Sequence, residues 1–176
     1  MIIEQVTQVG NSVIRAKAKK VTGVKSEKAQ KVIQDLIDSM RHHELIGMAA
    51  PQIGSNLRIF ITEIRKTRSR SGNEIKKDPL KIYVNPRIVW RSEKQVIGYE
   101  GCGSVAFANL YGIVKRAKSV IVKAQDEKGK AFEFKTDGLL AVVIQHEYDH
   151  IEGTVFTDRA DPKSYMSLDE YVSSKK

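Results

Sequence analysis

The sequence predicts an α+β domain in which antiparallel or mixed β-sheets pack around a central C-terminal helix, with an amphipathic helix near the N-terminus. Strand-like patterns gather between residues 57 and 135 and precede a strongly apolar helical segment, which is typical of α+β rather than alternating α/β chains. The 176 residues contain no repeat or linker, and this length suits one domain. Residues 1–176 are therefore predicted to form a single domain with a polar tail over 161–176.

The first helix is predicted from Ser26 to Glu44. Ser26 is a typical N-cap, and apolar residues recur at the i, i+3, i+4 and i+7 spacing of one helix face. These apolar residues are Ala29, Val32, Ile33, Leu36, Ile37 and Met40. His42 and His43 end the helix, where histidine suits the helix dipole, so we do not expect them to bind a metal.

The middle of the chain is predicted to form strands. Residues 57–64 and 82–90 are rich in apolar and β-branched side chains, and Pro86 within the second segment indicates an edge strand or a bulge. Residues 119–124 alternate between apolar and polar side chains. After a turn containing glycine, residues 131–135 are expected to return as the second strand of a hairpin.

A second helix is predicted from Leu139 to about Ile151. Asp137 is placed to cap its first turn, and Gly153 is placed to end it. The polar segment 161–176 is expected to be a loop or a short surface helix.

The chain carries a formal charge of +9, from 30 lysines and arginines and 21 acidic residues. One basic cluster, at residues 65–70, lies in a segment predicted to be an exposed loop. No motif for sequence-specific nucleic-acid binding accompanies these charges. We expect a solvated basic surface, with electrostatic attraction to a polyanionic assembly such as the ribosome as the alternative.

The sequence contains no segment predicted to cross a membrane or direct secretion. No uncharged stretch reaches the ~18 residues that a spanning helix needs, and the first residues lack the pattern of a signal or transit peptide. The single cysteine, Cys102, excludes an internal disulfide and suits a reducing compartment. A cytoplasmic monomer is expected.

The second helix contains the strongest motif, Gln145-His146-Glu147-Tyr148-Asp149-His150. Histidines four residues apart on a helix lie on one face, ~6 Å apart along the axis, and can share a metal ion. Glu147 between them can take a proton from a metal-bound water. The apolar run 139–144 implies burial, and buried histidines and a carboxylate require partners. We predict a metal site here, against the alternative of hydrogen-bonded core histidines.

Cys102 is the expected third ligand. It lies in Glu100-Gly101-Cys102-Gly103-Ser104, whose glycines allow the backbone to approach a ligand closely. A thiolate suits zinc or ferrous iron. The downstream carboxylates Glu152, Asp158 and Glu170 have less suitable surroundings.

A third segment, Ile46–Gly54, is rich in small residues and contains Gln52. The Gln52 amide could stabilise an oxyanion as a carbonyl becomes tetrahedral. Taken alone, this segment is expected to be a tightly packed turn rather than part of a site.

These three segments resemble the three motifs of the peptide deformylases, in the same order and at similar spacing. The similarity extends through Val84–Ile88 and through Asp137–Ala141, which lead into the other motifs, and covers nearly the whole chain. It implies a metal-dependent amidase that removes the formyl group from N-formylmethionyl nascent polypeptides. The family commonly uses ferrous iron, with zinc, nickel or cobalt as substitutes, and its need for formylated substrates suits a bacterial-type cytoplasm.

The resemblance also implies roles for individual residues. By similarity the metal ligands are Cys102, His146 and His150. Glu147 is the general base and later protonates the departing amine, while Gln52 and the backbone N–H of Gly103 hold the formyl oxygen. The residues expected to shape the site and bind the substrate backbone are Ile46, Gly47, Glu100 and Gly101. The apolar wall for the methionine side chain is expected from Leu139, Val142 and Val143.

Several positions depart from the family pattern. Leu45 stands where the first motif usually begins with glycine, Gly103 replaces a leucine after the cysteine, and Ala106 replaces a proline. The segment 106–112 is longer than in common members, and Tyr111 takes the place of an arginine. Gly103 is expected to widen the pocket and to loosen a hydrogen-bond donor, so restoring leucine there should raise activity.

Three alternatives to this interpretation stay open. The chain could be a divergent, weakly active protein that acts on another N-acyl peptide, or a zinc endopeptidase built on the HExxH motif. A non-catalytic module associated with the ribosome or RNA is the third alternative, which the intact motif residues disfavour.

Overall fold

A computed structural model describes residues 1–3, 5–67 and 76–174. The strands are β1 (Gly47–Ala49), β2 (Ile59–Ile64), β3 (Asp78–Arg91), β4 (Gln95–Gly101), β5 (Leu110–Ala117), β6 (Ser119–Gln125), β7 (Ala131–Asp137) and β8 (Met166–Ser167). They form a five-stranded sheet of order β1-β2-β3-β6-β7 and a three-stranded sheet of order β4-β5-β8, in which all neighbours are antiparallel.

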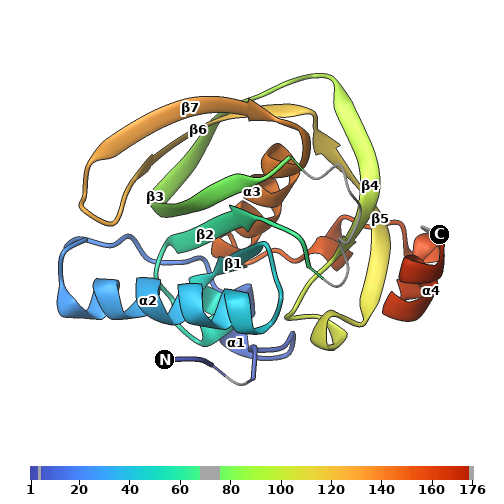
Figure 1. Ribbon diagram of the computed structural model, residues 1–176, viewed down its shortest axis with the longest axis horizontal. Coiled ribbons are helices and arrows are strands. Elements are labelled where there is room, and N and C mark those ends of the chain that lie inside the picture. The colour runs from blue at the N-terminus through green and yellow to red at the C-terminus, as the bar shows by residue number, and fades with distance from the viewer. Residues whose placement is uncertain (4, 68–75, 175–176) are drawn as a thin grey trace.

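The helices are α1 (Ser12–Arg15), α2 (Glu27–His42), α3 (Gly138–Ile151) and α4 (Leu168–Ser173), with short 3-10 turns at Ala50–Ile53, Ala106–Ala108, Phe156–Asp158 and Pro162–Ser164. The two sheets curve around α3 (Figure 1). Helix α2 lies on the outside of the five-stranded sheet, and α4 lies beyond β5 of the three-stranded sheet. The predicted α+β class, with its central C-terminal helix, is confirmed.

Helix α2 forms where its apolar periodicity predicts it. The Ser26 hydroxyl accepts a hydrogen bond from the Ala29 N–H at 3.3 Å, as expected for an N-cap. Ile33, Leu36 and Met40 are buried against the first sheet. This packing fixes the end of α2, and therefore the start of β1, beside the site described below.

Helix α3 is buried because its apolar residues meet both sheets. Ala141, Ile144 and Ile151 have no exposed surface and pack with residues of β2 and β3 in the five-stranded sheet and with Ala117 of β5 in the three-stranded sheet. Gly153 ends the helix with φ = +79°, a left-handed conformation that favours glycine. Asp137 precedes the helix as predicted, but its side chain makes no capping hydrogen bond to the residues that the structure describes.

The two predicted strands and the hairpin are present as β2, β3, β6 and β7. The register of β3 against β6 shifts between Val84 and Arg87, which places a bulge at Pro86. Since β3 lies between β2 and β6, the bulge interpretation is correct and the edge interpretation is wrong. Strands β4 and β5 were not predicted from the sequence, because the glycines in these segments weaken their strand pattern.

The polar tail is attached to the second sheet. Its 3-10 turn and α4 agree with the expectation of a loop or short helix, whereas β8, which pairs with β5, was not predicted. Tyr171 is buried, with its ring stacked 4.2 Å from that of Tyr111. The last two tail residues, 175 and 176, lie outside the described residues, as do residues 68–70 of the basic cluster.

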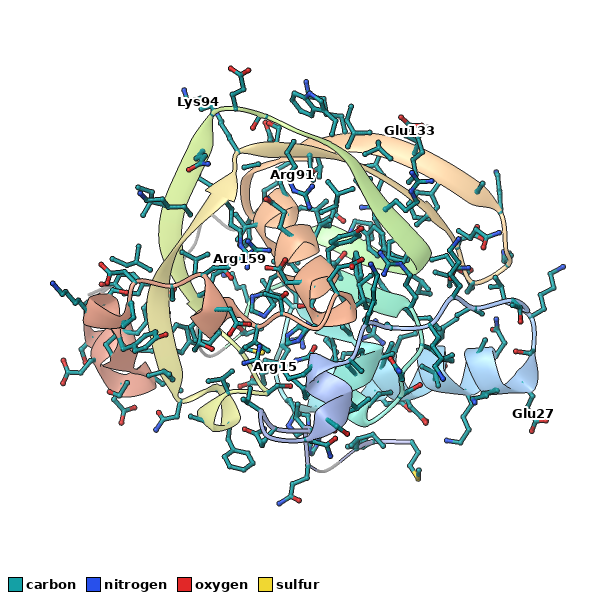
Figure 2. The ribbon with its side chains drawn as sticks, turned by 180° about the vertical axis from the view of Figure 1, so that it is seen from behind. Arg15, Glu27, Arg91, Lys94, Glu133 and Arg159 are labelled. Atoms are coloured by element: carbon teal, nitrogen blue, oxygen red, sulfur yellow. The ribbon has the colours of Figure 1, made fainter. Side chains whose placement is uncertain are left out.

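Among the described helices, none combines the length and the apolar character that a membrane crossing requires. Charged side chains such as Lys94 and Glu133 project from the outer edges of the sheets (Figure 2).

Candidate metal centre and active site

Helix α3 and the end of β4 bring the three predicted metal ligands together. Cys102 Sγ lies 3.1 Å from His150 Nε2, and the rings of His146 and His150 are 5.1 Å apart. One ligand atom from each residue lies within 4.8 Å of the others. The four-residue spacing on α3 therefore gives the shared face that the HExxH motif predicts, and Cys102 completes it from a segment 48 positions earlier.

The chemistry of this cluster suits a divalent transition metal. Thiolate and imidazole are the ligands that zinc and ferrous iron accept, and three protein ligands leave a coordination position open. Burial alone would raise the pKa of the Cys102 thiol, but the neighbouring His150 and His146 rings bring this pKa to about 5. The buried Nδ1 atom of His150 has no hydrogen-bond partner among the described residues. The cluster fits a metal ion.

A buried network of ion pairs holds the His146 ring at its Nδ1 atom. The Glu100 carboxylate lies 2.9 Å from His146 Nδ1 and accepts two hydrogen bonds of 2.8 Å from Arg116. Arg116 also donates to Asp149 at 2.5 Å. Burial raises the pKa of Glu100, yet Arg116 and His146 together hold it at about 2. A carboxylate bonded to a ligand histidine fixes the ring orientation.

This supporting network was not predicted from the sequence. Asp149 lies within the helix motif, and Arg159 lies beside α3 and donates to Asp149 at 2.6 and 2.8 Å (Figure 2). One signal was available for Arg116. Arg116 shares the inward face of β5 with Gly112 and Val114, and an arginine on a buried face requires buried partners.

Glu147 is 4% exposed and faces the cluster from the adjacent position on α3. Its Oε2 atom has no hydrogen-bond partner among the described residues. Burial raises the pKa of Glu147 to about 7, against the opposing effect of the two histidines. Gly47 in β1 makes this position possible, because a β-carbon there would lie 2.5 Å from Glu147 Oε1.

Gln52 approaches the cluster from the 3-10 turn that follows β1. Its Oε1 atom accepts a hydrogen bond of 2.8 Å from the Ala49 N–H, which directs the NH₂ group toward Cys102 Sγ at 3.8 Å. The segment is both a tightly packed turn and a source of an oriented amide donor, so the two interpretations of this segment are compatible.

One pocket gathers twelve of the thirteen predicted site residues, while His150 lies behind it. The lining contains Ile46, Gly47, Gln52, Glu100, Gly101, Cys102, Gly103, Leu139, Val142, Val143, His146 and Glu147. Leu45 and Tyr99, which were not among the predicted site residues, also line it. Gly101 allows Tyr111 to pack against the backbone beside Cys102, since a β-carbon at residue 101 would lie 2.7 Å from the tyrosine ring.

The loop after Cys102 explains two of the sequence departures. Ala106, Phe107 and Ala108 have φ values of +48°, +52° and +63°. Proline is held near φ = −65°, so the loop in this conformation excludes proline at residue 106. Tyr111 at the end of the loop stacks on Tyr171, so its ring connects β5 to the tail.

Comparisons with known proteins agree with this geometry. The family model described as polypeptide deformylase matches residues 3–165. A peptide deformylase of Dictyoglomus turgidum is 36% identical, covering 94% of this chain and 98% of the relative.

Two solved structures are also similar. The Met-Ala-Ser-bound class I type b peptide deformylase of Acinetobacter baumannii has a TM-score of 0.82 at 27% identity, covering 90% of this chain and 100% of that chain. A probable peptide deformylase of Synechococcus phage S-SSM7 has a TM-score of 0.75 at 35% identity, covering 88% and 98%. These relatives do not favour the endopeptidase alternative or that of another N-acyl peptide. Because the family match spans nearly the whole length, the chain belongs to the polypeptide deformylase family, and it is a metal-dependent hydrolase of that class.

Proposed function

We propose that this deformylase removes the formyl group from N-formylmethionine at the start of nascent polypeptides, with Glu147 as general base. The observation that carries the proposal is the Oε2 atom of Glu147, which is buried beside the Cys102, His146 and His150 cluster and has no hydrogen-bond partner in the part of the chain that the structure describes. The Acinetobacter relative with Met-Ala-Ser bound supports the substrate class, because this tripeptide is the product of deformylating formyl-Met-Ala-Ser.

Cys102, His146 and His150 would hold one divalent ion, with ferrous iron as the native ion and zinc, nickel or cobalt as substitutes. Their thiolate and imidazole groups suit this series of ions. The ion, when bound, supplies Lewis-acid chemistry that activates water and polarises a carbonyl group. Glu100 and Arg116 keep the His146 ring oriented toward the cluster.

Side-chain and backbone groups of the protein carry out the remaining steps of the reaction. The Gln52 amide and the Gly103 N–H hold the formyl oxygen, where negative charge develops as the carbon becomes tetrahedral. The Glu147 carboxylate accepts a proton from the attacking water. It then returns this proton to the amine nitrogen as the C–N bond breaks, so that formate and a free amino terminus leave the site.

The pocket walls would bind the start of the peptide. Leu139, Val142 and Val143 supply an apolar surface for the methionine side chain. Strand β4 pairs only with β5 among the described strands. Its other edge, near Glu100 and Gly101, could therefore hydrogen-bond to an extended peptide backbone.

The cellular setting is part of the same proposal. A protein that processes nascent chains would act in a bacterial-type cytoplasm as a monomer, and its charge of +9 would favour electrostatic association with the ribosome. We expect this association to weaken as the ionic strength rises.

Release of formate from formyl-Met-Ala-Ser by anaerobically purified, metal-loaded protein tests the proposed function. Glu147→Gln keeps the shape of the side chain but removes the proton acceptor, and should lower kcat by about 10²–10⁴-fold. Glu133→Gln is the matched control, since Glu133 lies at the outer edge of β7 (Figure 2). Full activity in Glu147→Gln would disprove the assigned role, and a metal-loaded protein that releases no formate would disprove the function.

A further inference from the structure

The side chain of Gln8 connects the N-terminal segment to the loop that follows the metal-ligand cysteine. Its NH₂ group donates to the Gly103 carbonyl at 2.8 Å and to the Val6 carbonyl at 2.9 Å. Its Oε1 atom accepts a hydrogen bond from the Phe107 N–H at 3.1 Å. Both amide hydrogens and the amide oxygen are therefore used, and two of these three bonds cross nearly a hundred positions of sequence.

The backbone on either side of Gln8 reinforces this connection. The Val9 N–H donates to the Ser104 carbonyl at 2.8 Å, and the Thr7 N–H donates to the Gln52 carbonyl at 2.8 Å. Residues 7–9 thus bind both segments to which the proposed function assigns the two donors for the formyl oxygen. The distance between these donors depends on this short segment.

Gly103 needs such support more than another residue would. Glycine has the largest backbone freedom, and a hydrogen-bond donor in an active site is effective only when its position is fixed beforehand. On one side Cys102 is fixed by the histidine cluster, whereas on the other side the chain enters the left-handed run at residues 106–108. Gln8 is bonded to both ends of the segment from Gly103 to Phe107.

We propose that Gln8 is a positioning residue, which holds the Gly103 peptide in the orientation that stabilises the formyl oxygen. The inference rests on the proposed role of the Gly103 N–H. Gln8 takes over the restraint that a larger side chain at residue 103 would give through its own packing.

Gln30 offers a matched control. It is also half-buried, and its NH₂ group donates to two backbone carbonyls, those of Val24 at 2.8 Å and Glu127 at 2.9 Å. It connects the start of α2 to the β6–β7 turn and is not among the residues that line the pocket. Gln8→Leu and Gln30→Leu therefore each remove two hydrogen bonds from an amide NH₂ group to backbone carbonyls, and Gln8→Leu also removes the bond from the Phe107 N–H. Only Gln8→Leu changes the support of Gly103.

The first measurement is the amide order parameter of Gly103, obtained by ¹⁵N relaxation on the zinc-loaded protein, because zinc is diamagnetic. We expect a value near 0.85 in the parent protein and below about 0.6 in Gln8→Leu. Gln30→Leu should keep the parent value. An unchanged order parameter in Gln8→Leu would overturn the inference, and this result does not depend on deformylase activity.

The second measurement is the kinetics of formate release. Gln8→Leu should lower kcat by about 10–10²-fold with a small change in KM, as expected for a misplaced catalytic group. Gln8→Glu keeps the acceptor for Phe107 but places an oxygen against the Gly103 carbonyl, so it should lose activity to a similar extent. The loss caused by Gln8→Leu should be smaller in a Gly103→Ala background, where the backbone is stiffer. Equal kcat values for Gln8→Leu and Gln30→Leu would overturn the inference, whereas an inactive parent protein would overturn the proposed function.

Discussion

The side chain of Leu45 lies over Gly103, with Leu45 Cδ1 only 3.3 Å from the position that a β-carbon at residue 103 would occupy. Both residues line the pocket. They are also two of the positions where the chain departs from the family pattern of glycine in the first motif and leucine after the cysteine. In this chain the Leu45 side chain therefore occupies space beside Gly103 that a side chain at residue 103 would need. The pocket is not simply widened by the glycine, as the sequence had suggested.

This contact changes the expected outcome of restoring leucine. Gly103→Leu alone should crowd Leu45 and Val6 and lower the free energy of unfolding by about 1–3 kcal/mol. Gly103→Leu combined with Leu45→Ala should recover stability and raise kcat on formyl-Met peptides. Urea unfolding and formate release of the two single variants and the double variant form a double-mutant cycle. Strictly additive effects would contradict the packing relationship.

Gly47 should not tolerate a side chain. In Gly47→Ala the added methyl group would meet Glu147 Oε1 at 2.5 Å and Val143 Cγ1 at 2.7 Å, so the carboxylate must move. We expect kcat to fall by at least about 10²-fold, the effect of displacing a catalytic group by about 1 Å. Gly98→Ala is the control, because a β-carbon at residue 98 meets nothing within 4 Å. Comparable activity in the two variants would refute the prediction.

Arg116 should matter for stability more than Arg159. Arg116→Met leaves the buried carboxylates of Glu100 and Asp149 without their shared partner, which should cost about 3–5 kcal/mol of unfolding free energy. The Arg159 side chain is 48% exposed, and Asp149 is its one ion-pair partner among the described residues, so Arg159→Met should cost much less. Denaturant unfolding of both variants measures the difference.

The same pair of variants also tests the link between the network and the metal. Arg116→Met should weaken zinc binding by about 10–100-fold, because Glu100 no longer holds His146 firmly. Competition with a chromogenic chelator gives this affinity. Equal stability and equal zinc affinity in the two variants would show that the network has no special role.

Removal of the metal should lower the melting temperature, since a ligand that binds only the folded state stabilises it. At a free zinc concentration 100 times the dissociation constant, the expected gain is about 2.7 kcal/mol. Thermal unfolding of chelator-treated protein, before and after zinc is restored, measures this gain. Cys102→Ser should remove most of it, while Ser92→Ala at the β3–β4 turn should retain it. An equal gain in Cys102→Ser would exclude Cys102 as a ligand.

The sequence by itself determined the features that depend on local spacing. The apolar periodicity predicted α2, the alternating pattern predicted the β6–β7 hairpin, and the four-residue interval placed His146 and His150 on one face of α3. Each of these follows from backbone geometry within about one or two helical turns or one hairpin. The motifs, taken together, also indicated the family.

Only the tertiary structure decided which residues contact one another in and around the pocket. The bonds from Arg116 to Glu100 and Asp149, the contact of Leu45 with Gly103, and the hydrogen bonds of Gln8 join segments that are far apart in the chain. No local pattern encodes them, because whether a glycine leaves a space or an arginine finds a partner depends on the side chain opposite. That neighbour is set by how the two sheets close around α3.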